Sequence, residues 1–160
     1  MTISVGDSIP LVTVMASSAD GPEEMTTDEI FRGKTVVLFG VPGAYTPTCS
    51  ARHFPPYVEQ AAAFTEKGVD LVACMAVNDA FVMRAWGKEQ GAGDAVLMLA
   101  DGSGVLTRAL GLEFDLTERG MGVRSQRFAM IVKDGKVAHI AVEKPGELDV
   151  SRAESVLAAL

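Results

Sequence analysis

An apolar, β-branched run from Thr35 to Val41 ends directly in a Pro-Gly turn. Such a run predicts a strand covered on both faces, because a strand with one face in water alternates apolar and polar residues. Thr46 and Pro47 then predict the beginning of a helix, since threonine is a favoured N-cap and proline a favoured first helical residue. Ligand sites in open α/β sheets favour the edge where such a strand ends.

The first long helix is expected from Thr46 to about Lys67. Its apolar positions have a loosely helical spacing, and Gly68 is a plausible C-terminal stop. Pro55 and Pro56 remove two backbone donors inside this helix. We therefore expect a kink or a break at these two prolines.

The middle of the chain continues the alternation of strand and helix. The expected elements are buried strands over 69–77 and 95–100 and helices over 79–90 and 103–110. Asn78 is the expected N-cap of the helix over 79–90, and Gly111 ends the shorter helix. The apolar side expected for the longer helix comprises Phe81, Val82, Ala85 and Trp86.

The two ends of the chain predict antiparallel structure and a closing helix. Residues 7–30 predict a hairpin or edge strand and then one helical turn, Thr27 to Phe31, which Gly33 stops. Asp134-Gly135 between the apolar runs 127–132 and 136–142 predicts a hairpin. An amphipathic helix is expected over 151–160. The order implies an α/β fold with a central mixed sheet, helices on both faces, and one domain over residues 1–160.

Composition excludes several classes of function. The net charge of −7 argues against nonspecific binding to nucleic acid or to an anionic membrane. The first ten residues lack the pattern of a secretory signal, and no apolar run reaches the roughly 20 residues of a membrane helix. Two cysteines make a disulfide framework improbable and favour a reducing compartment, which we expect to be the cytoplasm.

Cys49 is the candidate for chemistry, because it falls in the first turn of the expected helix. There the free backbone N–H groups and the positive end of the helix dipole favour a thiolate over a thiol. Arg52 and His53 follow within one turn, but helical spacing alone does not direct either toward the sulfur. The alternative is a small buried hydrophobe, the usual role of a lone cysteine. The sequence does not suggest a distant histidine that would act as general base for Cys49, as in cysteine proteases.

Several segments of the chain resemble the peroxiredoxins. Pro42, Thr46 and Cys49 reproduce their Pro-x-x-x-Thr-x-x-Cys signature, and the surrounding residues 40–53 are similar to the type-five subfamily, which includes the plant type-II enzymes. Further matching segments are 72–82, 100–101, 110–112 and 124–130. The resemblance implies a thioredoxin-like fold and thiol-dependent reduction of hydrogen peroxide and alkyl hydroperoxides.

The same resemblance implies a role for each matching residue. Cys49 is then the peroxidatic nucleophile, which becomes a sulfenic acid as water or alcohol leaves. Thr46 hydrogen-bonds the reacting oxygen, Pro42 shields the thiolate from water, and Arg127 supplies fixed positive charge. Backbone N–H groups between Gly43 and Cys49, including Thr48, complete the substrate cradle. This mechanism requires neither a metal nor an organic cofactor.

Four other residues have weaker claims. His53 also matches the subfamily, and either tunes reactivity or is structural. Arg124 helps orient its loop. Tyr45 and Phe114 either wall an apolar entrance for alkyl peroxides or belong to a core or an interface.

The reduction of the sulfenic acid is ambiguous in sequence. Cys74 is the only other thiol, and it lies inside a buried run where an inert core cysteine is the default. A disulfide to Cys74 would need Cα atoms within about 7 Å. We therefore favour a one-cysteine cycle recycled by glutathione or glutaredoxin, with thioredoxin as another candidate reductant. The subfamily resemblance also suggests an isologous homodimer.

Competing functions are separated by specific features. A thioredoxin-type oxidoreductase requires Cys-x-x-Cys, but Thr46 occupies the position of the first cysteine. A dinucleotide enzyme is disfavoured because Gly102-Ser103-Gly104 lacks the third glycine of the motif. A redox sensor that signals through oxidised Cys49 stays open, since a sensor also needs a reactive thiol.

Overall fold

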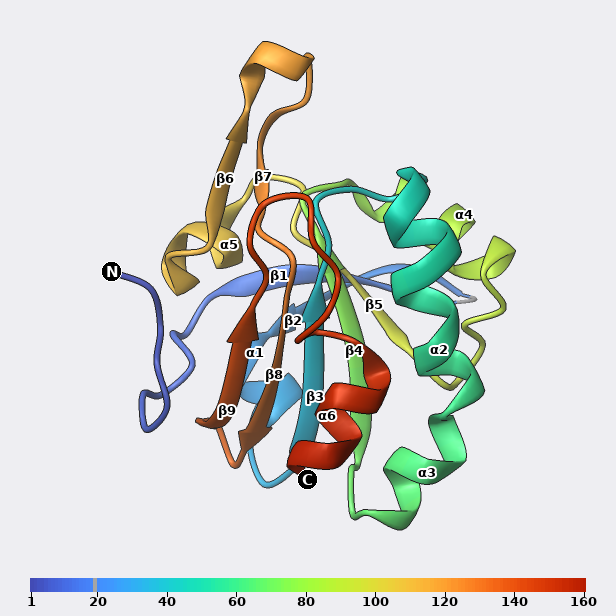
Figure 1. Cartoon of the computed structure of the whole chain (residues 1–160), viewed down its shortest axis with the longest axis vertical. Helices are drawn as coiled ribbons and strands as arrows, with labels where there is room; N and C mark the ends of the chain where they lie inside the picture. Colours follow the sequence, from blue (N-terminus) through green and yellow to red (C-terminus); the bar gives the residue numbers. More distant parts are fainter. Residues whose placement is uncertain (19) are drawn as a thin grey trace.

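The computed structural model describes residues 1–18 and 20–160, and its centre is a seven-stranded mixed sheet (Figure 1). The strands lie in the order β2-β1-β5-β4-β3-β8-β9. Their bounds are β1 Thr13–Ser18, β2 Gly21–Thr26, β3 Thr35–Gly40, β4 Leu71–Ala76, β5 Leu97–Ala100, β8 Phe128–Lys133 and β9 Lys136–Val142. The order confirms the predicted mixed sheet, including the hairpin β1–β2 at one edge and the hairpin β8–β9 at the other.

Three parallel strands form the middle of the sheet. β3 pairs with β4 and β4 with β5, so Cys74 lies beside Phe39 on one side and Met98 on the other. All three strands therefore end at the same edge, and β8 runs antiparallel to β3 alongside them. The turn after β3, which leads to Cys49, lies at this edge, as the sequence predicts.

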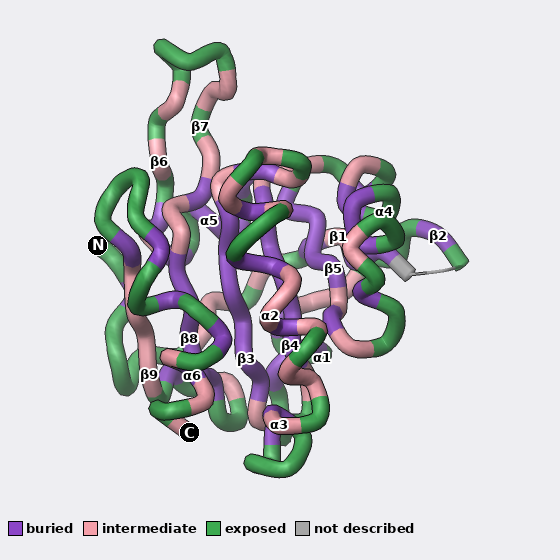
Figure 2. Tube along the Cα trace, turned by 45° about the vertical axis from the view of Figure 1, so that its right-hand side comes forward, coloured by how far each residue is buried: buried purple, intermediate pink, exposed green. Residues whose placement is uncertain are grey.

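Helices cover both faces of the sheet (Figure 1). Their bounds are α1 Thr27–Phe31, α2 Phe54–Glu59, α3 Ala61–Glu66, α4 Ala80–Glu89, α5 Val105–Leu110 and α6 Ala153–Ala159. Val37 and Phe39 share one core with side chains of α2, α3, α4 and α6. Val36 and Leu38 point to the opposite core, which α1 and α5 cover. The central strands are therefore buried along their length (Figure 2), as their uninterrupted apolar runs predict.

A second, two-stranded sheet projects from the body of the molecule (Figures 1 and 2). β6 (Glu113–Leu116) pairs antiparallel with β7 (Gly122–Ser125), and the short 3₁₀ helix η2 (Thr117–Arg119) lies between them. The sequence analysis predicted no element here, because these short strands are only partly buried and carry no continuous apolar run.

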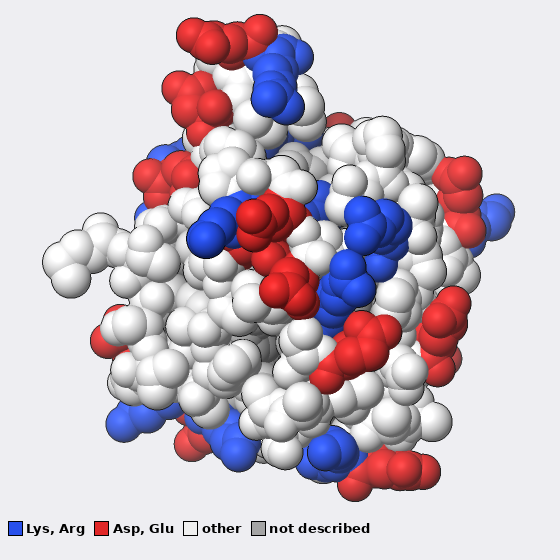
Figure 3. Space-filling view, viewed as in Figure 1, with Lys and Arg blue, Asp and Glu red and all other residues white. Residues whose placement is uncertain are grey.

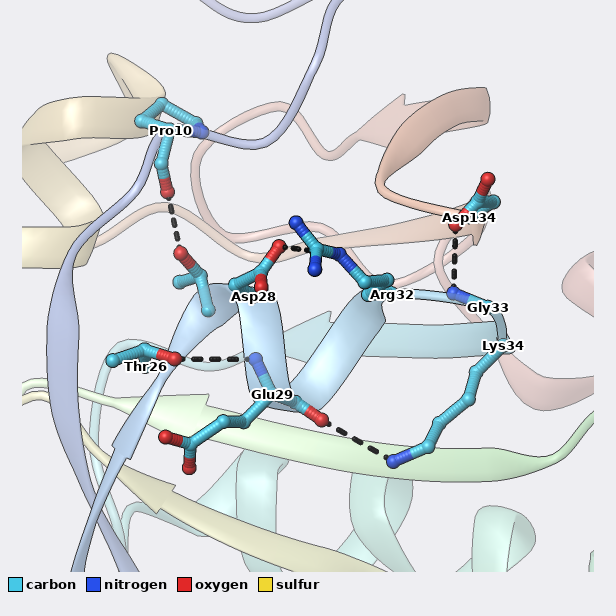
Figure 4. Close-up of polar contacts among 9 residues, drawn as sticks. Pro10, Thr26, Asp28, Glu29, Arg32, Gly33, Lys34 and Asp134 are labelled. Atoms are coloured by element: carbon cyan, nitrogen blue, oxygen red, sulfur yellow. Dashed lines mark hydrogen bonds and ion pairs between the residues drawn. The ribbon is translucent and has the colours of Figure 1, made fainter.

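Polar contacts fix α1 against its neighbours (Figure 4). The hydroxyl of Thr26 accepts from the backbone N–H of Glu29 at 3.2 Å and caps the helix. Asp134, in the β8–β9 turn, accepts from the N–H of Gly33 at 2.7 Å. Asp134 and Gly135 both have positive φ, 48° and 76°, as a two-residue hairpin turn of this type requires. The Asp-Gly turn thus joins the hairpin to the end of α1.

The long helix predicted over 46–67 is three segments instead of one. A π-helical turn, η1 (Cys49–His53), leads into α2, and α3 follows after a break at Gln60. The π-helical turn ends just before Pro55 and Pro56, and the backbone stays helical through His53 and Phe54. The regular α-helical bonding is therefore interrupted beside the two prolines, as expected, because they cannot donate to the carbonyls of the preceding turn.

Two expectations about α4 are also wrong. Asp79, rather than Asn78, caps the helix and accepts from Val82 N at 2.9 Å, because the Asn78 side chain accepts from Ala44 N instead. The buried face consists of Ala80, Met83, Trp86 and Gly87. Phe81 and Ala85 face solvent, and the side chain of Phe81 is 73% exposed.

Charged side chains of both signs intermix on the face shown in Figure 3. Across residues 1–18 and 20–160, the structure contains no helix with the length and apolar character that crossing a membrane requires.

Candidate active site

Cys49 begins the π-helical turn that follows β3, and its side chain is fully buried. π-helical turns are rare and often occur at functional sites. The strand that leads to it ends at Gly40, where a Cβ would lie 2.1 Å from the ring of Phe128. Only glycine therefore lets β3 end against Phe128 while the chain turns toward Cys49.

Arg127 reaches Cys49 from the connection between β7 and β8. Its Nη2 donates to the sulfur at 3.1 Å, and its Nη1 lies 2.8 Å from Nδ1 of His53. A positive charge at hydrogen-bond distance favours negative charge on the sulfur. The structure thus brings together two residues that the sequence analysis had linked by resemblance alone.

His53 is a neutral imidazole with one defined tautomer. Its Nε2 lies 2.9 Å from the carbonyl oxygen of Ser151, which can only accept, so Nε2 carries the proton. Nδ1 therefore holds a lone pair and accepts from the guanidinium of Arg127. Burial, together with the positive charge of Arg127, lowers the pKa of His53 to about 3. The neutral ring thus holds one branch of the guanidinium beside the sulfur.

The segment between β9 and α6 contributes Ser151 and Glu143, which hold His53 and Arg127 in place. The carbonyl of Ser151 also accepts from the hydroxyl of Tyr57 at 2.6 Å. The backbone N–H and the hydroxyl of Ser151 donate to Oε2 of Glu143 at 2.9 and 2.7 Å. Glu143 is almost fully buried, and its own N–H donates to the carbonyl of Arg127 at 2.9 Å. These contacts join the chain before α6 to the thiol.

Thr46 and Gly43 form the turn that leads into η1. The hydroxyl of Thr46 donates to the carbonyl of Gly43 at 2.8 Å, so the expected side-chain N-cap is wrong. The backbone carbonyl of Thr46 accepts the first helical bond, from Ser50 at 3.0 Å. The N–H groups of Thr48 and Cys49 precede that bond, and as first-turn donors they have no partner within the helix.

A cavity of about 530 Å³ opens at this turn. Pro42, Thr46, Thr48 and Arg127 line it, whereas Gly43 and Cys49, the other two predicted substrate-binding residues, are not in its lining. The projecting hairpin and the loop after β9 supply its walls, through Glu113, Phe114, Leu116, Arg119, Met121, Glu143, Lys144, Pro145 and Gly146 among others. The cavity therefore joins an apolar wall to charged side chains beside the thiol.

The residues with weaker claims fall in different places. Phe114 lines the cavity, but Tyr45 is about half exposed and lies outside its lining. Tyr45 has a positive φ of 65°, a conformation that costs energy in a residue with a Cβ. Arg124 donates through Nε to the carbonyl of Met121 at 2.7 Å, and its Nη1 would lie 3.2 Å from a Cβ at position 43. This packing leaves little room for any residue but glycine there.

Cys74 lies in β4, in the same core as Cys49, and is fully buried. Burial, reinforced by the nearby Cys49, raises the pKa of the Cys74 thiol well above its ordinary value. Both cysteines are free thiols. Cys74 is thus held in the protonated form, which is a poor nucleophile.

Sequence reasoning missed Ser151, Glu143 and Trp86. The indole N–H of Trp86 donates to the hydroxyl of Ser50 at 3.0 Å and thereby fixes α4 to η1. No local pattern marks Ser151 or Glu143, because their partners lie about 100 residues earlier in the chain or several residues away across a loop. A glutamate directly after an apolar strand was the one available signal.

Comparison with known proteins assigns the family. The redoxin family model matches residues 4–157. Peroxiredoxin-2B of Arabidopsis thaliana is 48% identical over 99% of this chain and 98% of its own length. The chain belongs to the peroxiredoxins. Within that family, it is also 49% identical to the chloroplastic peroxiredoxin-2E-2 of Oryza sativa, over 99% of this chain and 73% of the relative.

The structure of this peroxiredoxin is similar to that of a solved relative. Reduced Prx3 from Vibrio vulnificus, crystallised in complex with hydrogen peroxide, superposes with a TM-score of 0.94 at 49% identity, covering 99% of both chains. The fold is therefore the thioredoxin fold of the peroxiredoxins, as the sequence resemblance implied. Membership of this family supports thiol-dependent peroxidase activity as the function of the chain.

Proposed function

We propose that this peroxiredoxin reduces hydrogen peroxide and alkyl hydroperoxides at Cys49. The observation that carries the proposal is the 3.1 Å contact between the Cys49 sulfur and Nη2 of Arg127, a residue that also lines the cavity. The thiolate sulfur attacks one peroxide oxygen, an S–O bond forms, and the O–O bond breaks. The other oxygen leaves with the electron pair, takes up a proton, and departs as water or alcohol. Cys49 becomes a sulfenic acid, oxidised by two electrons.

The neighbouring groups have complementary roles in that step. Arg127 donates toward the charge that develops on the breaking O–O bond. The hydroxyl of Thr46 donates to Gly43, so its oxygen is free to accept from the peroxide O–H. The backbone N–H groups of Thr48 and Cys49 donate into the same space. Pro42 lines the cavity without a backbone N–H and limits access of water to the sulfur.

We propose a one-cysteine cycle in which glutathione or glutaredoxin reduces the sulfenic acid. The buried position and raised pKa of Cys74 support an outside thiol as the reductant. Arg119 and Lys144 on the cavity lining offer positive charge to the carboxylates of glutathione. The outside thiol attacks the Cys49 sulfur, an S–S bond forms, and the S–O bond breaks as the hydroxyl leaves as water. A second thiol then attacks the outside sulfur of this mixed disulfide, so that the two outside thiols leave as a disulfide and Cys49 returns to the thiolate.

Turnover with defined reductants tests this cycle. Wild type, Cys49→Ser and Cys74→Ala are compared for peroxide consumption with glutathione plus glutaredoxin and, separately, with thioredoxin. We expect no turnover from Cys49→Ser and unchanged turnover from Cys74→Ala with the glutathione system. Loss of turnover in Cys74→Ala, with the first oxidation intact, would make Cys74 a resolving thiol. A single stoichiometric oxidation with every reductant would instead indicate a sensor.

We further propose an isologous homodimer formed through the exposed face of α4 and the nearby Tyr45. Phe81, Ala85 and Glu89 recur every four residues along the exposed face of α4, and Tyr45 interacts with Glu89 at its end. The side chains of Phe81 and Tyr45 are 73% and 49% exposed, which supports burial against a second copy of this face. Sedimentation equilibrium should give a dimer for wild type and a monomer for Phe81→Glu. A wild-type monomer at high concentration contradicts the proposal.

We also propose that the chain works in a reducing compartment such as the cytoplasm, on the basis of its two free thiols. Fractionation of the source cells followed by immunodetection tests this placement.

A further inference from the structure

The loop between β9 and α6 places one carboxylate oxygen among three donors. Oε2 of Glu143 accepts from the N–H of Asp149 at 2.6 Å and from the N–H and hydroxyl of Ser151 at 2.9 and 2.7 Å. Only an acceptor without a hydrogen of its own can satisfy three donors at one oxygen. Glu143 is only 6% exposed, and burial alone would raise its pKa. Hydrogen bonds from Ser151 and its neighbours outweigh burial and lower that pKa, so the side chain stays ionised.

Because Ser151 is fixed by Glu143, its carbonyl oxygen is held at a defined position beside His53. Its carbonyl oxygen accepts from His53 Nε2 at 2.9 Å and from the Tyr57 hydroxyl at 2.6 Å, so both acceptor directions of the oxygen are occupied. Because Nε2 must donate there, Nδ1 is left as the acceptor for Arg127. If this carbonyl moved, the imidazole would be free to adopt the other tautomer, whose Nδ1–H would face the Nη1–H of the guanidinium.

We propose that Glu143 is a positioning residue for the peroxide reaction: by holding Ser151 it fixes the tautomer of His53 and thereby keeps the Arg127 guanidinium against the Cys49 sulfur. The functional part of this inference rests on the proposed peroxidase activity. The structural part concerns only the four residues of the hydrogen-bond chain and Cys49.

The same residue contacts the arginine a second time. The N–H of Glu143 donates to the carbonyl of Arg127 at 2.9 Å, so both the main chain and the side chain of Arg127 depend on the start of this loop. Glu143, Lys144 and Pro145 also line the cavity. A molecule that displaces the loop from the cavity side therefore displaces the group that activates the thiol.

The state of the His53 ring tests the structural part directly. The sequence contains two histidines, so a His139→Gln variant identifies the ring nitrogen signals of His53 in a ¹⁵N NMR spectrum. At neutral pH the wild type should show one neutral tautomer protonated at Nε2. In Glu143→Ala we expect averaging of the two nitrogen signals. Unchanged ring signals in folded Glu143→Ala overturn the proposal.

Reactivity of Cys49 tests the functional part with two reagents. Hydrogen peroxide measures the proposed reaction, and iodoacetamide measures thiolate reactivity without a peroxide, so the inference is testable even if the chain reduces no peroxide. We expect Glu143→Ala to slow both reactions about tenfold, which is the effect of losing one well-placed hydrogen bond to a charged group. Glu143→Gln should stay within about twofold of wild type, since its amide oxygen can still accept.

Two further variants make the result decisive. Glu147→Ala is the matched control, because Glu147 is exposed on the same loop and its N–H, rather than its carboxylate, makes the contact to Lys144. It should react at the wild-type rate. Ser151→Ala removes one of the three donors and should slow both reactions about threefold. If Glu143→Ala does not fold, Ser151→Ala decides: wild-type rates together with unchanged His53 signals overturn the proposal.

Discussion

Arg127 donates from Nη2 to the sulfur of Cys49 at 3.1 Å, although 78 residues separate the two in the chain. The other branch of the guanidinium meets His53, which lies one turn beyond Cys49. A single arginine therefore contacts both the first and the last residue of the π-helical turn η1. We expect the geometry of Arg127, as well as its charge, to determine how fast the thiol reacts.

Replacement of Arg127 should slow the oxidation of Cys49 by hydrogen peroxide. We expect a loss of about 10² to 10³ in rate for Arg127→Ala, as for other donors that stabilise charge in a transition state. Arg127→Lys keeps the charge but lacks the planar fork whose two nitrogens contact the sulfur and His53, so an intermediate loss is expected. The single tryptophan, Trp86, donates to Ser50 beside Cys49, so stopped-flow tryptophan fluorescence can follow the reaction.

The control for these variants is Arg32→Ala. Arg32 is exposed, and its side chain pairs with Asp28 of α1. It should oxidise at the wild-type rate, and the arginine variants should retain the wild-type circular dichroism spectrum. An Arg127→Ala protein that is folded and reacts at the wild-type rate would contradict the assigned role.

The buried His53 predicts how stability depends on pH. Its pKa is lowered to about 3 in the folded protein from an ordinary value of 6.5, so between these values the unfolded chain binds more protons. The free energy of unfolding should therefore rise with pH across this window, by at most about 1.4 kcal/mol per pH unit from this one group.

Urea unfolding between pH 4 and pH 7, taken as approximate limits of the window, measures this slope. The slope should be smaller in His53→Gln than in wild type and unchanged in His139→Gln. Equal slopes in wild type and His53→Gln would show that His53 is not buried as a neutral ring.

Gly40 is predicted to be intolerant of any side chain. A Cβ there would lie 2.1 Å from the ring of Phe128, which is itself fully buried and has no room to move. Gly40→Ala should lower the free energy of unfolding by about 3 kcal/mol. Gly102→Ala, whose Cβ would lie no closer than 3.4 Å to its neighbours, should change it by less than about 1 kcal/mol. Chemical unfolding of both variants compares the two sites, and equal effects would refute the packing argument.

The projecting hairpin should influence the choice of peroxide. Phe114 and Leu116 line the cavity, so an alkyl group of the substrate would contact them. Phe114→Ala should lower kcat/KM for cumene hydroperoxide about tenfold and leave hydrogen peroxide nearly unaffected, since loss of apolar contact is worth about 1–3 kcal/mol. Val123→Ala is the control, because Val123 is exposed on the same hairpin outside the cavity lining. An equal loss for both peroxides in Phe114→Ala would mean that the hairpin acts on the site as a whole.

The sequence predicts the sheet well because its central strands are buried on both faces. The apolar runs that end at Val41, Val77 and Ala100 are long enough to indicate strands without any tertiary information, and Asp134-Gly135 has the conformation that its hairpin requires. The helix over 46–67 was harder, since two prolines suggest a break. The prolines indicate where the regular helix is interrupted, but nothing in the local sequence shows that the segment before them is a π-helical turn or that a second break lies at Gln60.

The site residues also differ in whether a local motif or a tertiary contact marks them. Cys49, Thr46 and Pro42 belong to one continuous motif, and the placement of Arg127 follows from the family resemblance. Ser151 and Glu143 have no such motif, because their contacts depend on how β9 and α6 meet η1 across the core. The cap of α4 was misassigned for a similar reason: the amide of Asn78 has a tertiary partner, Ala44, that local propensity cannot reveal.

The hydrogen-bond chain from Cys49 to Ser151 also determines when, during synthesis, Cys49 acquires its final surroundings. Arg127 lies 78 residues beyond Cys49, and Ser151 lies 98 residues beyond His53. During synthesis Cys49 is therefore made well before the groups that complete its surroundings. We expect its full reactivity toward peroxide only after these later residues have left the ribosome and packed against η1.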